Sequence, residues 1–379
     1  MSEKIQEHIK ELEDRMNAMQ INKHTQKSIN YIKAQLAKLR DELITIASSK
    51  SGGGKGFAIK KSGDAQVAFI GFPSVGKSSL LNLLTGGNTD SKVASYDFTT
   101  LSAIPGMMEI NQAKIQLIDL PGIILGAAIG KGRGKEILSA ARSADLILII
   151  ICYKNDGKIY FNDLYQIRKE LFDAGIRLNT QPAFITIKKR EKGGISFSFN
   201  GAQIMEQDEV KALMNEFGYH NASVYFGEPN VTSDKLIDCL MGNRVYTREL
   251  VVINKEDLDD KSTPDEQITQ AIGHNNWVKV SALNQKHIKD LQQRIFHELD
   301  LIRVYLKPPQ GEADMEKPMI LHKGDTLKEL CEKIHKSFLT SYKYCMIWGP
   351  SAKHPGQRFQ VLDHVLEDGD IVSIYLKRG

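Results

Sequence analysis

The stretch VAFIGFPSVGKSSLLNLL, residues 67–84, contains an apolar run, a glycine-rich turn and a second apolar run at helical spacing. Residues 67–70 predict a short buried strand and residues 78–84 predict a helix. Between them, residues 71–78 match the pattern GxxxxGK[ST] in the strand–turn–helix context that this pattern requires. The sequence therefore predicts a phosphate-binding P-loop.

The residue types of this turn suit phosphate groups and a divalent cation. Glycines let successive backbone N–H groups point at phosphates, and the helix N-terminus adds a favourable dipole. Lys77 can reach the β- and γ-phosphates and act in catalysis, while Ser78 can ligate Mg²⁺. The alternative is a Gly/Ser turn without a ligand. The nucleotide-binding residues predicted here are Gly71, Phe72, Pro73, Ser74, Val75, Gly76, Lys77, Ser78 and Ser79.

Further apolar runs predict a sheet around the P-loop. Residues 115–120, 146–151, 250–253 and 278–280 are predicted as buried strands that alternate with helical segments. This alternation predicts an α/β fold with a doubly wound sheet, and the P-loop makes it a P-loop NTPase fold. Ligands of such sheets bind at the carboxyl ends of the strands.

Two downstream segments can complete the Mg²⁺ and γ-phosphate site. Asp119-Leu-Pro-Gly122 ends a predicted strand, so Asp119 can hold Mg²⁺ through water and the Gly122 N–H can contact the γ-phosphate. This motif alone is weak, because Asp-Pro-Gly stretches are common turns. Thr100 is the predicted switch threonine, with Thr99 as the alternative. The predicted metal residues are Ser78, Thr100 and Asp119, and the predicted catalytic residues are Lys77, Thr100 and Gly122.

Two motifs at strand ends predict the base. Asp257 can accept hydrogen bonds from guanine N1 and N2, Lys255 can lie over the ring, and the Ala282 N–H can meet O6. Adenine would leave such groups unpaired. The sequence therefore predicts GTP and GDP as ligands and disfavours an ATP-using kinase. The predicted base-site residues are Asn254, Lys255 and Asp257 of the motif NKED, and Ser281, Ala282 and Leu283 of the motif SAL.

Periodicity and composition divide the rest of the chain. Residues 1–50 predict a helical hairpin and the Gly-rich residues 51–63 a linker. The G domain is predicted at 64–173 and 239–306, with a helix over 290–306. It is interrupted by an α+β subdomain at 174–238, because that interval is too long for one connection. Residues 308–317 predict a second linker, and residues 318–379 have the strand and helix pattern of a β-grasp domain.

Composition indicates a globular, multidomain protein. The chain has 379 residues, 41% hydrophobic and 25% charged, which is enough for two to four domains. Its four cysteines are scattered without CxxC pairing, which suits a reducing compartment. The N-terminus is charged, and the longest apolar run, 146–152, is too short to span a bilayer. We therefore expect a cytoplasmic protein without membrane association.

Basic residues gather in two places, although the net charge is only +4. Residues 22–63 contain nine Lys or Arg but only two acidic residues, and Lys188-Lys189-Arg190 lies in the predicted insertion. Such charge can bind RNA phosphates without sequence-specific readout, or it can form a solvated helix face. Sequence-specific DNA binding is not indicated. The first group is Lys23, Lys27, Lys33, Lys38, Arg40, Lys50, Lys55, Lys60 and Lys61.

With their flanking residues, these motifs resemble a known family. The segments GFPSVGKSSLLNLL, SYDFTTLSAIPG, KIQLIDLPGIILGAAIGKGRGKEILSAARSADLILI and YCMIWGPSAKHPGQ are similar to Obg-related GTPases, specifically developmentally regulated GTP-binding (DRG) proteins. The resemblance covers nearly the whole chain. It implies a helical N-terminal region, a G domain with an insertion similar to domain 2 of ribosomal protein S5, and a C-terminal TGS domain.

The same resemblance implies partners. It implies association with ribosomes or translation factors and, in eukaryotic relatives, a regulatory partner protein that raises activity. Leu125 departs from the family, whose members usually have an acidic residue three positions after the glycine that Gly122 matches. This departure concerns the switch II response and not GTP binding.

The residue after Gly122 predicts slow hydrolysis. Many GTPases have a water-orienting glutamine there, whereas this chain has Ile123, which cannot hydrogen-bond. Lys77, Mg²⁺ and the P-loop amides can supply part of the rate by positioning and charge compensation. A potassium ion near Ser74, where several potassium users carry asparagine, can supply more. Arg133 is a second candidate, as a cis arginine finger or as a loop arginine facing solvent or RNA.

Two functions fit this sequence. The first is a GTPase switch in translation. The second is a nucleotide-stabilised RNA- or ribosome-binding scaffold in which hydrolysis is incidental.

Overall fold

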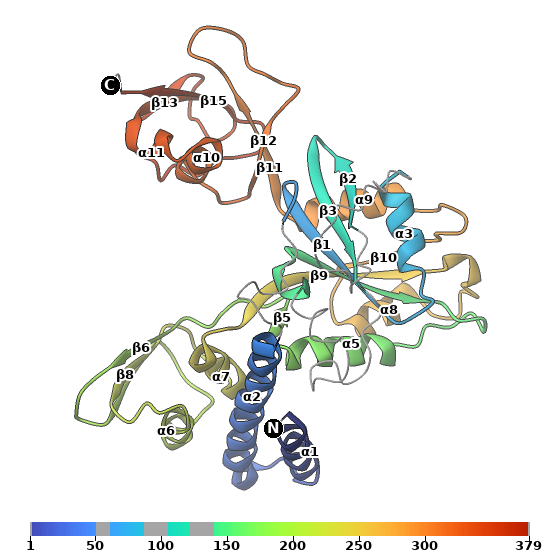
Figure 1. Cartoon of the computed structure of the whole chain (residues 1–379), viewed down its shortest axis with the longest axis vertical. Helices are drawn as coiled ribbons and strands as arrows, with labels where there is room; N and C mark the ends of the chain where they lie inside the picture. The colour runs from blue at the N-terminus through green and yellow to red at the C-terminus, as the bar shows by residue number, and fades with distance from the viewer. Residues whose placement is uncertain (1, 51–60, 87–104, 121–139, 378–379) are drawn as a thin grey trace.

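A computed structural model describes residues 2–50, 61–86, 105–120 and 140–377. In it a central α/β domain carries a C-terminal domain on one side and an inserted subdomain with the N-terminal helices on the other (Figure 1). No helix within these ranges has the length and apolarity needed to cross a membrane.

The central sheet has the strand order β10-β9-β4-β1-β3-β2, with β5 beside β9. Its neighbouring strands are parallel except for β2 and β3. Both β1 and β4 are buried along their whole length, as expected for strands covered on two faces. The predicted α/β fold class is confirmed. The strands are β1 (Ala65–Ile70), β2 (Pro105–Ile110), β3 (Ala113–Asp119), β4 (Leu146–Cys152), β5 (Ile176–Leu178), β9 (Val245–Asn254) and β10 (Trp277–Lys279).

Helices cover both faces of this sheet. Leu80 of α3 (Lys77–Leu84) and Leu291 of α9 (Ile288–Glu298) pack on one face. Leu164 of α5 (Asn162–Asp173) and Ile268 of α8 (Asp265–Ile272) pack on the other. Each of these buried side chains stabilises the fold by roughly 1.5–3 kcal/mol. The packing holds the carboxyl ends of the strands in fixed positions.

The inserted subdomain is a three-stranded sheet with the order β6-β8-β7, covered by two helices. Its core joins Val224 and Phe226 of the sheet to Leu213 and Leu236 of the helices. Ala34 of the N-terminal helix α2 belongs to the same core. The elements are β6 (Ile185–Lys189), β7 (Ile195–Phe199), α6 (Gln207–Glu216), β8 (Ala222–Phe226) and α7 (Ser233–Met241).

The N-terminal helices α1 (Ser2–Asn17) and α2 (Lys23–Lys50) form the predicted hairpin. Three basic side chains of α2 form ion pairs within the protein, and two of them are lysines: Lys33 pairs with Asp234 at 2.9 Å and Lys38 with Glu216 at 2.8 Å. Arg40 lies 2.5 Å from Glu13 and 2.8 Å from Asp173. Farther along, Lys61 pairs with Asp145 at 2.6 Å.

Each of these four cations thus has a carboxylate partner, from α1, α5, α6, α7 or the residue before β4. Lys27, also on α2, is exposed. Binding of RNA phosphates by the basic stretch stays a prediction. The side chains of Lys23 and Lys50, and all of Lys55 and Lys60, lie outside the described residues.

The C-terminal domain is a five-stranded sheet, order β12-β11-β15-β13-β14, packed against α10 and α11. The helix predicted over 290–306 is wrong in its second part: α9 ends at Glu298 and β11 follows. Asp300 has a left-handed φ of 49° that stops the helix, and the β-branched and aromatic run LIRVYL then pairs as a strand. The elements are β11 (Leu301–Leu306), β12 (Met319–His322), α10 (Leu327–Ile334), α11 (Ser337–Ser341), β13 (Tyr342–Trp348), β14 (Gln357–Phe359) and β15 (Ile371–Leu376).

Asp173, at the end of α5, is a buried carboxyl group with an unusual titration. Burial raises the pKa of Asp173 to about 6, because the effect of burial is larger than the opposing effect of the Arg40 charge. Because the pKa of Asp173 in the folded state lies above the ordinary value of 3.8, the folded state binds this proton more tightly than the unfolded chain does. The stabilisation that comes from the bound proton is complete below pH 3.8 and is lost as the pH rises through about 6.

The stability of the Asp173→Asn variant, relative to that of the wild type, should therefore increase as the pH rises. Between about pH 4 and pH 7 the unfolding free energy of the variant should rise, relative to that of the wild type, by on the order of 1–3 kcal/mol. Thermal midpoints of both proteins at several pH values measure this. A difference that stays constant across that range would contradict the assignment.

Candidate nucleotide-binding site

The P-loop connects the end of β1 to the start of α3 and depends on two close backbone approaches. A Cβ at Gly71 would lie 2.5 Å from the Ile150 carbonyl oxygen of β4. At Gly76, which has a φ of +94°, a Cβ would lie 2.2 Å from Nδ2 of Asn254. Both positions therefore require glycine. Ser74, with a φ of 64°, gives the loop a further left-handed residue.

Lys77 lies under this loop. Its Nζ donates to the carbonyl oxygens of Gly71 at 3.0 Å and Phe72 at 3.1 Å. Burial lowers the pKa of Lys77, and the charge of Asp119 opposes that shift. Within the described residues Lys77 forms no ion pair. Its position suits a phosphate as the partner for its charge.

Ser78 and Asp119 bring two oxygen ligands together. Ser78, at the start of α3, donates from Oγ to Oδ2 of Asp119 at 2.6 Å, and Asp119 ends β3. The other oxygen, Oδ1 of Asp119, is buried and has no hydrogen-bond partner among the described residues. A hydroxyl and a carboxylate are oxygen ligands that Mg²⁺ accepts. These two side chains therefore fit the divalent cation that the sequence predicts.

Asn254 joins the P-loop to the base-site motifs. It ends β9 and is 1% exposed. Its Nδ2 donates to the Val75 carbonyl oxygen at 2.8 Å, and its Oδ1 accepts from the Ala282 N–H at 3.1 Å. The sequence predicts Asn254 at the nucleotide but carries no signal for this bridging role. The predicted contact of the Ala282 N–H with guanine O6 therefore competes with an internal hydrogen bond.

The remaining base-site residues lie beside this bridge. Lys255 has a left-handed φ of 61°, and the 3-10 turn η1 (Glu256–Leu258) follows it. Asp257 accepts a hydrogen bond from Oγ of the buried Ser281, whose Oγ in turn accepts from the Asn284 N–H at 3.1 Å. Leu283 is 80% exposed at the edge of the site. The NKED and SAL motifs thus form one hydrogen-bonded unit.

Several predicted residues lie outside the described part of the chain. These are Thr99, Thr100, Gly122, Ile123, Leu125 and Arg133. Their roles stay predictions.

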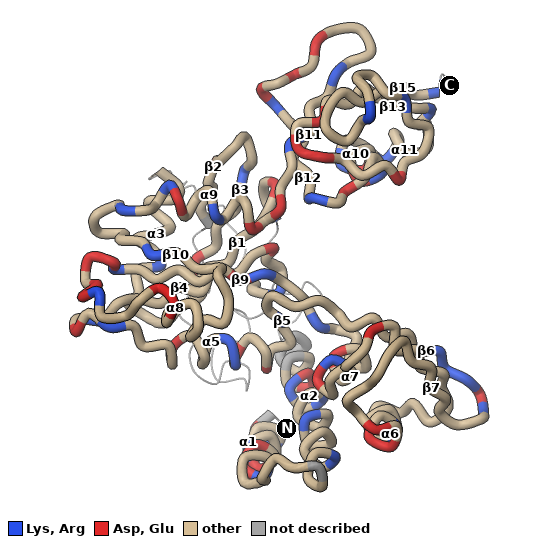
Figure 2. The backbone as a smooth tube through the Cα atoms, turned by 180° about the vertical axis from the view of Figure 1, so that it is seen from behind, with Lys and Arg blue, Asp and Glu red and all other residues tan. Residues whose placement is uncertain are grey.

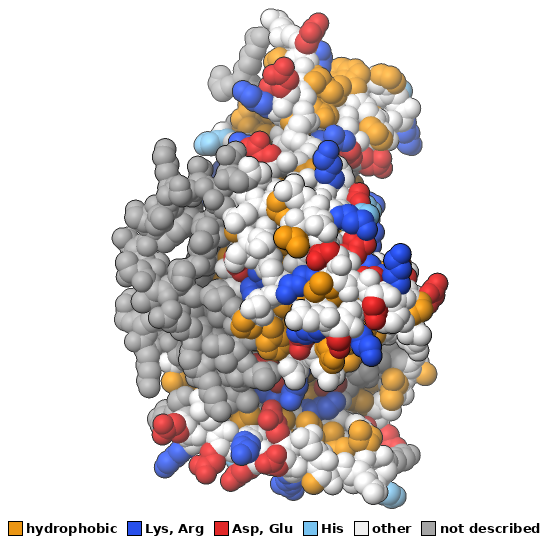
Figure 3. Space-filling view, turned by 90° about the vertical axis from the view of Figure 1, so that its right-hand side faces the viewer, with side chains coloured by type: hydrophobic (Ala, Val, Ile, Leu, Met, Phe, Trp, Pro, Cys, Tyr) orange, Lys and Arg blue, Asp and Glu red, His pale blue; other side chains and the backbone are white. Residues whose placement is uncertain are grey.

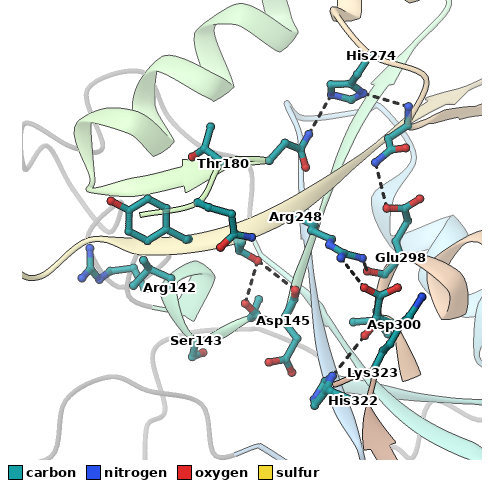
Figure 4. Close-up of a pocket in the computed structure, with 18 of the residues that line it drawn as sticks. Arg142, Ser143, Asp145, Thr180, Arg248, His274, Glu298, Asp300, His322 and Lys323 are labelled. Carbon is teal, nitrogen blue, oxygen red and sulfur yellow. Dashed lines mark hydrogen bonds and ion pairs between the residues drawn. The ribbon is translucent and has the colours of Figure 1, made fainter. Parts of the chain in front are cut away.

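A cavity of about 760 Å³ lies at the other end of the strands, where β4 and β9 begin, and reaches the C-terminal domain at His322 and Lys323 (Figure 4). Its charges are largely paired with one another. Arg248 lies 2.5 Å from Asp300, and Asn276 donates to Glu298 at 3.0 Å. Since the P-loop lies at the opposite strand ends, this cavity is not the predicted nucleotide site.

Family models match successive parts of the chain. A model described as "50S ribosome-binding GTPase" matches residues 66–189, and one described as the C-terminal region of that domain matches 192–301. A TGS domain model matches residues 302–376, which include all of β11 except Leu301. These matches agree with the position of β11 in the C-terminal sheet.

Curated relatives match over almost the whole length. An uncharacterized GTP-binding protein of Methanocaldococcus jannaschii is 46% identical, over 99% of this chain and 93% of that protein. Developmentally-regulated G-protein 3 of Arabidopsis thaliana is 42% identical, over 98% of this chain and 99% of that protein. Developmentally-regulated GTP-binding protein 1 of Xenopus laevis is 42% identical, over 97% and 98%.

Among solved structures, the FeoB G domain from Methanococcus jannaschii is 18% identical and covers 62% of this chain and 97% of that chain. Its TM-score is 0.34. The family models and the relatives matched over nearly their whole length show the family. They confirm the family resemblance seen in the sequence: the chain belongs to the developmentally regulated GTP-binding proteins, P-loop GTPases that generally use Mg²⁺ and here end in a TGS domain.

Proposed function

We propose that this chain hydrolyses GTP to GDP and phosphate, slowly on its own, as a Mg²⁺-dependent switch associated with the ribosome. One observation carries the proposal: Lys77, the Ser78–Asp119 pair and the Asn254 bridge converge at the carboxyl ends of β1, β3 and β9. This convergence supports a site in which phosphate, metal and base would be bound side by side.

Each group has a role in this proposal. The backbone N–H groups of the P-loop and Lys77 bind the phosphates and compensate the charge that develops during transfer. Ser78, Asp119 and Thr100 would hold Mg²⁺, which when bound neutralises charge on the β- and γ-phosphate oxygens. Asp257 and Lys255 hold guanine, and Gly122 contacts the γ-phosphate. Because Ile123 cannot orient water, the unaided rate is low.

Potassium is the proposed aid to hydrolysis. A monovalent cation beside the P-loop at Ser74 would add positive charge where the transition state needs it. We therefore expect single-turnover GTP hydrolysis to be several-fold faster in K⁺ than in Na⁺ at equal ionic strength. Equal rates in the two salts would remove potassium from the account. The rate of Arg133→Ala, measured in parallel, tests the arginine alternative. An unchanged rate would exclude Arg133 as a catalytic arginine finger.

Ribosome association is the cellular part of the proposal. It is supported by the description of the family model matched at residues 66–189. The test is GTP turnover in K⁺ with and without purified ribosomes, together with co-sedimentation in the GDP, GTP and non-hydrolysable-analogue states. Stimulated turnover and nucleotide-dependent sedimentation are expected. Sedimentation that ignores the nucleotide would favour the scaffold function. A regulatory partner protein and a cytoplasmic location belong to the same proposal.

A further inference from the structure

The sheet of the inserted subdomain has one covered and one uncovered face. Side chains alternate along each strand, so residues between the core positions point to the opposite face. On that face Thr186 and Ser198 flank Tyr225, and Lys188 and Ser196 flank Ser223, in the register of the sheet. These side chains are exposed, except Ser223, which is half-buried. Because α2, α6 and α7 pack on the other side, we call these residues, with Phe184, the outer face.

Two aromatic rings stand at one end of the outer face. Phe184 is 61% exposed and Tyr225 is 38% exposed, and their rings meet edge to face with centroids 6.0 Å apart. Phe184 is fixed in place. Its ring lies over Gly227, where a Cβ would come within 1.9 Å of it, and its carbonyl oxygen accepts from the Gly227 N–H at 2.7 Å. Rigid, exposed aromatic rings are what stacking of unpaired bases requires.

Basic side chains lie at the end of the outer face away from these rings. Lys188, Arg190 and Lys192 lie in or beside the β6–β7 connection, visible as a blue stretch in Figure 2. Among the described residues none of the three forms an ion pair, unlike Lys33 and Lys38 of α2. Glu191 is the one acid among residues 188–192, and β6, β7 and β8 contain no Asp or Glu.

The charged side chains of the central domain are arranged differently from those at the outer face. On the face shown in Figure 3, basic and acidic side chains are interspersed over the central domain. The cations at the other end of the central sheet are largely paired, as Lys61 is with Asp145 and Arg248 with Asp300. The outer face therefore combines unpaired positive charge with exposed rings.

We propose that the outer face of the inserted subdomain binds single-stranded RNA. Bases stack on Phe184 and Tyr225, and Lys188, with its basic neighbours in the connection, contacts phosphates. Hydroxyl groups between them, such as that of Ser198, can bond to phosphate oxygens or to the ribose 2′-OH. An acidic peptide would use the cations but not the rings. This inference rests on the proposed ribosome association and names the surface that contacts RNA.

The test is fluorescence anisotropy of a labelled oligouridylate with the full-length protein at two salt concentrations. Phe184→Ala should weaken binding about tenfold or more, since base stacking is sensitive to such truncation. Phe184→Leu, which keeps packing over Gly227, should also weaken it. Thermal midpoints near that of the wild type establish that both variants are folded.

The charge contribution is tested with a matched pair of variants. Joint replacement of Lys188, Arg190 and Lys192 with glutamine should weaken binding and lower the log–log salt slope by about 2, since each phosphate contact contributes about 0.7. The same change at the exposed Lys4, Lys10 and Lys211 removes equal charge elsewhere and should leave both unchanged. Equal loss in the two triple variants would overturn the proposal.

Two further results separate this inference from the proposed function. A polyglutamate peptide that displaces the RNA, together with normal affinity in both Phe184 variants, would assign the face to an acidic protein and overturn the RNA proposal. All variants should retain the wild-type rate of GTP turnover without ribosomes. If RNA binding fails while turnover and ribosome sedimentation persist, only this surface is wrong.

Discussion

Replacing Gly76 with alanine should weaken GTP binding by at least about 100-fold, which corresponds to about 2.7 kcal/mol. The residue has a φ of +94°, which an alanine adopts only at a cost of roughly 1–2 kcal/mol. The added Cβ would also lie 2.2 Å from Nδ2 of Asn254. Asn254 cannot move away without breaking its bonds to Val75 and Ala282, so both the P-loop and the base site should be disturbed.

Gly86→Ala is the matched control for this change. Gly86 also has a positive φ, +64°, but a Cβ there would meet nothing within 4 Å among the described residues. It should therefore lose a little stability and keep its affinity for GTP. Titration of both variants with a fluorescent guanine nucleotide measures the difference. Wild-type affinity in Gly76→Ala would show that the P-loop geometry described above is not the one that binds nucleotide.

Asp238→Ala should destabilise the protein by about 3–5 kcal/mol, because it leaves buried charges without a partner. The carboxylate of Asp238 accepts from Nε and Nη2 of Arg177, each at 2.6 Å, and from Nε of Arg244 at 3.0 Å. All three side chains are less than 10% exposed. Burial, together with the charge of Arg177, already lowers the pKa of Arg244. Without Asp238, two buried guanidinium groups would face each other where β5, α7 and β9 meet.

Asp234→Ala, on the same helix, is the control for this change. Asp234 pairs with Lys33 at 2.9 Å, but these side chains are 41% and 32% exposed. Such a pair contributes no more than about 1 kcal/mol. Thermal or urea unfolding of the two variants compares the effects. A loss in Asp238→Ala as small as that in Asp234→Ala would mean that the buried network does not hold this junction together.

The sequence signals of the candidate nucleotide site are local. A buried strand followed by GFPSVGKS defines a strand–loop–helix unit, and NKED and SAL each follow a strand end. Once the sheet is parallel, those ends must lie at one edge. The internal bond from Asn254 to Val75 is not local. It joins residues 179 positions apart and follows from how β9 and β1 are arranged around β4.

The errors have the same physical origin. The apolar spacing of residues 301–306 fits either a helix or a strand, and only the partner strands β12 and β15 decide it. The ion pairs of Lys33 and Lys38 could not be seen in the sequence because the carboxylate partners are distant, 201 positions away for Lys33 and 178 for Lys38. The exposed Phe184 likewise became informative only when the fold placed it beside Tyr225 on an uncovered face.

The most direct test of the account is the base preference of hydrolysis in the wild type and in Asp257→Asn. A carboxylate at 257 accepts from guanine N1 and N2, whereas an amide can donate to the 2-oxo group of xanthine. The wild type should hydrolyse GTP in preference to XTP and ATP, and Asp257→Asn should prefer XTP while keeping a comparable maximal rate. A wild type that hydrolyses ATP as well as GTP, or an Asp257→Asn variant that still prefers GTP, would contradict the account.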